Sequence, residues 1–93
     1  MTPDEVLDRA ADEITIRGWT QGLFEDPEGR VCAVGAINRT TAQATERIRA
    51  GWVLTFFIQG QVPIWNDAPG RTQDEVVDTF RLAAKHYREV HQS

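Results

Sequence analysis

Apolar residues recur at every third or fourth position near the start of the chain, which is the spacing of one helix face. These positions are Val6, Leu7, Ala10, Ala11 and Ile14. Residues 2–5, TPDE, have the form of a capping box with proline at the first helical position. Gly18 suits the position after a helix end that requires positive φ. The pattern predicts a helix over residues 3–17, with Trp19 lying back against Ile14.

The last part of the chain repeats this pattern, because residues 72–75, TQDE, form a second capping box. Apolar positions follow at helical spacing: Val76, Val77, Phe80, Ala83, Ala84, Tyr87 and Val90. The other face carries acids first and bases last, as the helix dipole favours: Asp74, Asp78, Arg81, Lys85 and Arg88. We predict a second long helix here, and we interpret its three basic residues as a solvated face rather than a phosphate-binding stripe.

A helix is also predicted in the middle of the chain, with Thr40 or Thr41 as its N-cap and a stop near Gly60. Residues 52–58 are apolar nearly all round, which indicates a buried central helix or one shared with another chain. We expect Trp52 to be a core residue. A strand over residues 52–58 is the competing prediction, because the run is short and rich in aromatic and β-branched side chains.

Turn-forming residues lie between the first and central helices. Residues 26–29, DPEG, suit a type I turn, which either joins two short strands, roughly 22–25 and 30–32, or closes a surface loop. Residues 32–41 suggest a short helix. The predicted fold is mainly α: one domain over residues 1–93, with three to four helices and a short β-hairpin or ordered loop after the first.

Charge and composition disfavour several classes of protein. The chain has a formal net charge of −4, which disfavours nucleic-acid binding, and a nucleic-acid-binding accessory protein that uses Arg39, Arg47 and Arg49 is the second alternative. No segment has the roughly 18 consecutive apolar residues of a membrane span. The N-terminal region has acids where a signal peptide would carry bases, so we expect a cytoplasmic protein. We expect no cofactor and no metal.

The single cysteine, Cys32, is the one candidate nucleophile, and it cannot form an internal disulfide. A helix beginning just after it would favour the thiolate, and His86, His91 or Asp67 would assist. Its neighbours are small and apolar, however, and such a cysteine is usually a packed core residue. The core interpretation is favoured, and a cysteine-dependent hydrolase or transferase is the alternative.

Two sets of residues are candidates for contact with a partner. Asp4, Asp8 and Asp12 repeat at every fourth position and form an acidic stripe, which either is solvated, binds a cation weakly or faces a basic partner. The second set is aromatic: Trp19, Trp52, Phe56, Phe57 and Trp65. These residues are either all core or divided between core and interface, and an exposed Phe57 or Trp65 would favour the interface.

The segment PIWNDAPGR, residues 63–71, concentrates polar groups before the last helix. Asn66 and Asp67 would supply an amide and a carboxylate to a pocket, with Arg71 as an anion anchor. The structural interpretation is favoured. In this interpretation Pro63 stops the preceding element and residues 68–70 form a turn. Asn66 satisfies a buried backbone group. Asp67 bonds backbone amides across the turn and pairs with Arg71.

Three motifs together resemble a family of small uncharacterised proteins of actinobacteria and their phages: GWTQG at 18–22, CAVGA at 32–36, and WNDAPGR at 65–71 followed by TQDEVV. The resemblance implies a small cytoplasmic protein, and phage proteins of this kind often disable a host protein.

Our leading hypothesis is a non-enzymatic module that binds a host protein, such as a growth, division or transcription factor, or that forms a homodimer. Its candidate contact residues are Asp4, Asp8, Asp12, Phe57, Trp65, Asn66, Asp67 and Arg71.

Overall fold

The computed structural model describes residues 1–91, and within them the regular secondary structure is helical. The helices are α1 (Pro3–Arg17), α2 (Ala33–Thr40), α3 (Ala44–Ile58), α4 (Val62–Asn66) and α5 (Gln73–His91). The mainly α fold class is therefore confirmed, and the short helix α4 is the element that the sequence did not predict. None of the helices in this range has the length and apolar character that a bilayer crossing requires.

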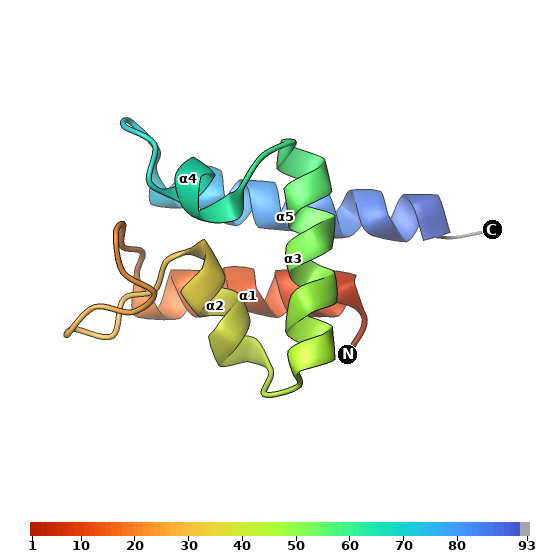
Figure 1. Ribbon diagram of the computed structural model, residues 1–93, viewed down its shortest axis with the longest axis horizontal. Coiled ribbons are helices and arrows are strands. Elements are labelled where there is room, and N and C mark those ends of the chain that lie inside the picture. Colours follow the sequence, from red (N-terminus) through yellow and green to blue (C-terminus); the bar gives the residue numbers. More distant parts are fainter. Residues whose placement is uncertain (92–93) are drawn as a thin grey trace.

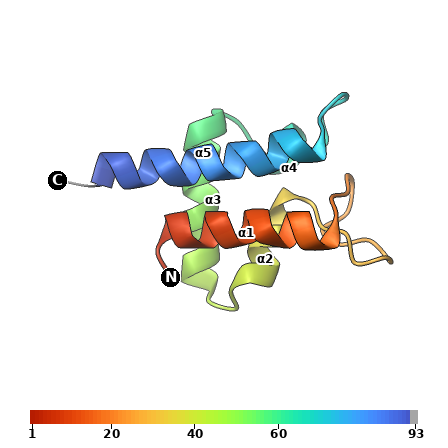
Figure 2. The same cartoon turned by 180° about the vertical axis from the view of Figure 1, so that it is seen from behind.

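The helices form two layers. The antiparallel pair α1 and α5 makes one layer (Figure 1). Helices α2, α3 and α4 cover one side of that pair, and α3 crosses both of its members steeply (Figure 2). The core lies between the layers, and its largest fully buried apolar side chains are Phe80, Leu7, Ile14, Leu54, Val6, Val31 and Val76.

The predicted apolar faces of the two long helices are buried to different extents. All five predicted positions of α1 are fully buried. On α5 the buried positions end at Ala84; Tyr87 is half-buried and Val90 is exposed. The C-terminal part of α5 therefore extends beyond the core and keeps apolar surface in contact with solvent.

The capping residues of α1 and α5 act as predicted at the first turn. The Glu5 carboxylate accepts hydrogen bonds from the Thr2 backbone N–H (2.8 Å) and hydroxyl (2.9 Å). The Thr72 hydroxyl accepts from the Glu75 backbone N–H at 3.1 Å. At the other end of α1, Gly18 has φ +91° and donates to the Ile14 carbonyl at 2.8 Å, which closes the helix as glycine permits.

The predicted start of the central helix is wrong by a few residues. Thr40 is the last residue of α2, and Thr41 follows it in an extended conformation. The N-cap of α3 is Gln43, whose backbone N–H donates to the Thr41 hydroxyl at 3.1 Å. Threonine hydroxyls satisfy local backbone groups both in turns and at caps, so the pattern did not distinguish the two positions.

The end of α3 is close to its predicted place. Gln59 adopts a left-handed conformation with φ +56°, and the Gly60 N–H donates to the Thr55 carbonyl at 3.3 Å. Residues 52–58 are helical, so the competing strand prediction is wrong.

Residues 18–32 form an ordered loop with two isolated bridges, Trp19 to Val31 and Glu25 to Val31, instead of a regular hairpin. The predicted turn is present, because the Gly29 N–H donates to the Asp26 carbonyl at 2.9 Å. The buried Asp26 carboxylate accepts from the backbone N–H groups of Glu28 (3.0 Å) and Arg30 (2.9 Å). These bonds give the loop a fixed shape without strand pairing.

The loop crosses α2 at Gly35, where the two backbones approach closely. A Cβ atom at this glycine would lie 1.8 Å from the Phe24 carbonyl oxygen. That same oxygen accepts a hydrogen bond from the Cys32 N–H at 3.1 Å, so the loop is held in place. The glycine of the CAVGA motif is therefore required by packing of loop against helix.

Helix α4 corrects the role predicted for Pro63. This proline lies in the first turn of α4, where a missing N–H costs nothing. Helix α3 has already ended at Ile58, so the prediction that Pro63 stops the preceding element is wrong. The turn after α4 is present as predicted, with the Arg71 N–H donating to the Ala68 carbonyl at 3.1 Å.

Candidate functional site

The three sequence motifs meet at the side chain of Asn66, which is 1% exposed. Its Oδ1 accepts from the Trp19 indole N–H (2.8 Å) and the Ala33 backbone N–H (3.0 Å). Its Nδ2 donates to the Thr20 carbonyl (3.2 Å) and the Asp67 carboxylate (2.9 Å). Two donors and two acceptor positions are the full capacity of an amide side chain. Asn66 thus joins α4, the loop and α2, and the prediction that it satisfies buried backbone groups is confirmed.

Neighbouring residues extend this contact between the GWTQG and WNDAPGR motifs. The Gln21 amide donates to the carbonyls of Asn66 (3.0 Å) and Ala68 (3.2 Å). The Asp67 carboxylate accepts from the Gly22 N–H at 3.0 Å, so it bonds the distant loop instead of its own turn. The polar groups that suggested a pocket are used to hold the loop on α4.

Arg71 contacts different groups from those that were predicted. Its guanidinium lies 4.6 Å from the centre of the Trp65 ring, donates to the Trp65 carbonyl at 2.9 Å and pairs with Glu75 at 2.9 Å. The predicted pair with Asp67 is therefore wrong. Arg71 lies in the turn just before α5 and reaches Glu75 in the first turn of that helix, whereas Asp67 faces the loop. Trp65 is half-buried and packs on the core.

The acidic stripe of α1 faces two arginines of α5. Arg81 pairs with Asp12 (2.6 Å) and Asp8 (3.4 Å). Arg88 pairs with Asp8 (2.9 Å) and Asp4 (3.3 Å). The interpretation that the acidic face of α1 and the basic face of α5 are solvated is thus wrong in part. The acids of α1 and the arginines of α5 form ion pairs where the two helices lie side by side. Sequence reasoning missed this because each stripe was considered without its partner helix.

These ion pairs predict a loss of stability in acid. Burial alone would raise the pKa of Asp4, but hydrogen bonds from Thr2 and Arg88 outweigh it and lower the pKa. A carboxylate whose pKa is lower in the folded state stabilises the fold above its unfolded pKa, and this contribution disappears as pH falls through the folded value. We expect the free energy of unfolding to be flat from about pH 7 to pH 5 and to fall below about pH 4.

Urea unfolding at pH 7, 5 and 3.5 measures this dependence, with Arg88→Gln as the comparison. The variant should lose less stability between pH 5 and 3.5 than the wild type, because one cation that lowers the pKa of Asp4 is gone. Equal losses in the two proteins would show that Arg88 does not contribute.

Cys32 is buried and serves as the N-cap of α2, where its sulfur accepts from the Gly35 N–H at 3.4 Å. It lines a cavity of about 300 Å³ together with Gly22, Leu23, Phe24, Pro63, Asn66 and Asp67. His86 and His91 line a different groove, on α5. Asp67 and Cys32 thus line the same cavity, and the two histidines lie elsewhere.

Two of the three arginines considered for nucleic-acid binding have contacts within the chain. Arg39 forms two hydrogen bonds to Glu25, at 2.7 and 2.9 Å, and Arg47 donates to the Thr41 carbonyl at 3.1 Å. Arg49 is exposed.

Within residues 1–91 no three His, Cys, Asp or Glu side chains gather as a metal site would require.

The exposed face of α3 is apolar, which contradicts the first of the two predicted alternatives, a buried central helix, and leaves the second, a helix shared with another chain, as a prediction. Trp52 is 63% exposed and Phe56 is 81% exposed, so the expectation that Trp52 is a core residue is wrong. With Ile48, which is also exposed, they repeat at every fourth position and form one stripe. Only Ala50 and Leu54 of α3 are buried, because the helix crosses the α1–α5 layer steeply and touches it along a narrow line.

Beside this stripe lies an apolar groove of about 410 Å³ between α3 and the C-terminal part of α5, which we call the α3–α5 groove. Phe57, which is 36% exposed, reaches across toward α5, with its ring centre 5.9 Å from that of His86. Of the predicted contact residues, Phe57 alone lies here. Trp52 and Phe56 were not chosen, although the apolar pattern all round α3 was the signal that pointed to them.

The fold and these contacts define a small all-α domain in which an asparagine-centred corner fixes a loop, and in which one helix carries an exposed aromatic stripe. The chain belongs to a family of unknown function (DUF6197), which matches residues 1–86. The match extends from α1 into the last turns of α5 and agrees with the resemblance to an uncharacterised family. Comparisons with curated proteins and with solved structures return no match.

Proposed function

We propose that this chain is a protein-interaction module that binds another protein through the α3 stripe and the adjoining α3–α5 groove, without chemistry of its own. The observation that carries the proposal is the exposure of Trp52 and Phe56 on one helix face. Tryptophan is enriched among the residues that dominate binding energy, and well-packed contact centres are built around such aromatic anchors.

The size of this surface supports the proposal. A fully buried aromatic side chain covers about 200 Å², so Trp52 and Phe56 together leave roughly 300 Å² of apolar surface in contact with water. Ile48, Phe57 and Val90 are exposed next to them or along the same groove. Contiguous apolar patches of this size on small proteins often mark binding sites.

The corner at Asn66 supports a non-catalytic role. Its amide, the Asp67 carboxylate and the Arg71 guanidinium all form hydrogen bonds within the chain.

The proposed partner is a host protein of growth, division or transcription. This part of the proposal rests on the resemblance to actinobacterial and phage proteins.

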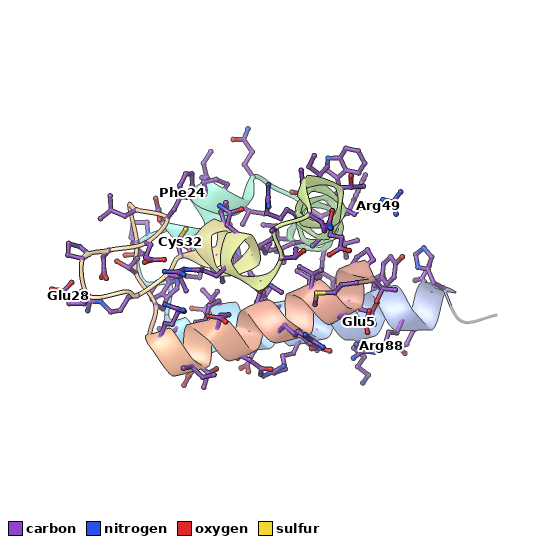
Figure 3. The ribbon with its side chains drawn as sticks, turned by 90° about the horizontal axis from the view of Figure 1, so that it is seen from below. Glu5, Phe24, Glu28, Cys32, Arg49 and Arg88 are labelled. Atoms are coloured by element: carbon purple, nitrogen blue, oxygen red, sulfur yellow. The ribbon has the colours of Figure 1, made fainter. Side chains whose placement is uncertain are left out.

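Affinity capture from an actinobacterial lysate tests the proposal, with wild type, Trp52→Ala and Phe56→Ala as baits. Both substitutions should abolish capture of the partner while changing the free energy of unfolding by less than about 1 kcal/mol, since these side chains are largely exposed. Phe24→Ala is the matched control, because Phe24 is equally exposed but lies on the loop near α4 (Figure 3).

Capture that is lost with Phe24→Ala and kept with Trp52→Ala and Phe56→Ala would place the binding surface elsewhere. A wild-type bait that retains no protein from any condition of growth or infection would remove the proposed function.

A further inference from the structure

The side chains of the α3 stripe, beside the α3–α5 groove, suit a helical ligand better than a β-strand. The stripe of Ile48, Trp52 and Phe56 is a ridge of i, i+4 and i+8 positions, against which a second helix packs in the commonest mode of helix packing. A β-strand would need a sheet edge to pair with, and residues 1–91 contain only isolated bridges. The buried Ala83 lines the groove and leaves room for an inserted side chain.

Charge distinguishes this groove from the rest of the protein. Its lining includes Arg49, His86 and His91 and contains no carboxylate, although the chain as a whole carries a net charge of −4. Arg49 extends from α3 on the side opposite Phe24, whereas Glu5 and Arg88 lie on the α1–α5 layer (Figure 3). The net charge of the protein therefore repels an acidic ligand, whereas the lining of this groove attracts one.

Several acids of α1 and α3 are already paired within the chain. Asp4 and Asp8 bind Arg88, and the Glu46 carboxylate binds the N-terminal amine at 2.8 Å. Arg49 has no ion-pair partner within residues 1–91, so its charge is available to a ligand.

A second copy of the chain matches the groove less well. It would present the same carboxylate-free lining, so that Arg49 would gain no counter-charge, and it would bring a net charge of −4 against another −4.

We infer that the groove binds an amphipathic helix of another protein, whose apolar side chains pack on Trp52 and Phe56 and whose flanking carboxylates pair with Arg49. This inference rests on the proposed function and specifies the chemistry of the partner.

A displayed library of helix-forming 20-residue peptides, with randomised surface positions, tests this chemistry on the full chain. Selected peptides should carry apolar residues at helical spacing and an excess of Asp and Glu, and Phe56→Ala should weaken their binding by more than about tenfold. Arg49→Glu should weaken the best acidic peptide by about three- to tenfold, and a version with each acid changed to Lys should regain affinity for that variant.

Selected peptides that are neutral or basic, or that bind Arg49→Glu as tightly as the wild type, would overturn the inference. So would a dimer in sedimentation at micromolar concentration that Phe56→Ala converts to monomer. If lysate capture depends on Trp52 and Phe56 while the selected peptides show no acidic excess, the proposed function stands and this inference fails. If neither capture nor selection depends on α3, both fail.

Discussion

Gly35→Ala is expected to destabilise the domain by about 3 kcal/mol or more, which lowers the melting temperature by roughly 12 °C or more. The added Cβ would lie 1.8 Å from the Phe24 carbonyl oxygen, and contacts between real Cβ atoms and their neighbours essentially never fall below 3.0 Å. The loop cannot retreat freely, because the same oxygen accepts from the Cys32 N–H. Thermal and urea unfolding followed by circular dichroism measure the effect.

Gly51→Ala is the matched control for this substitution. Gly51 is also helical, on α3, and a Cβ there would meet nothing within 4 Å. Helix propensity alone favours alanine by about 1 kcal/mol, so this variant should be unchanged or more stable. If the two variants unfold at the same temperature, the close approach of the loop to α2 does not exist.

Asn66→Ala is the second substitution with a large expected effect, of about 3 kcal/mol or more. It leaves the buried Ala33 N–H and two part-buried groups, the Trp19 indole N–H and the Thr20 carbonyl, without their partner. A buried group left unsatisfied costs about 1–3 kcal/mol. Urea unfolding measures the loss, and faster exchange of the Trp19 indole proton in NMR locates it at the corner.

Asn66→Asp and Gln21→Ala separate the buried amide from its surroundings. The aspartate keeps both acceptor bonds but loses the two donors and adds a negative charge beside Asp67, so this variant should regain stability as pH falls and the new carboxyl is protonated. Gln21→Ala removes bonds at a more exposed site and should cost about 1 kcal/mol. An Asn66→Ala protein as stable as Gln21→Ala would contradict the central role of this side chain.

Local signals in the sequence predicted the two long helices well. The capping box and the apolar spacing predicted the buried face of α1. The DPEG segment predicted the turn at residues 26–29 of the loop. Such features depend on residues within one turn of one another, so they can be recognised without knowledge of the fold.

Features that depend on tertiary contacts were predicted less well. An apolar surface all round α3 indicates burial or sharing with another chain, and the choice between these depends on how many helices cover it. In a chain of 93 residues only one side of α3 is covered, because α1 and α5 already pack on each other. Similarly, Asp67 and the acidic stripe of α1 bind residues that lie far away in the sequence, so local patterns did not predict these contacts.

Hydroxyl-radical footprinting of the captured complex tests the α3 surface most directly. In the free chain Trp52, Phe56 and Phe24 are all exposed and should react readily. Binding of the partner should reduce the modification of Trp52 and Phe56 severalfold and leave Phe24 unchanged. A complex that forms while Trp52 and Phe56 stay as reactive as in the free chain would contradict binding through α3.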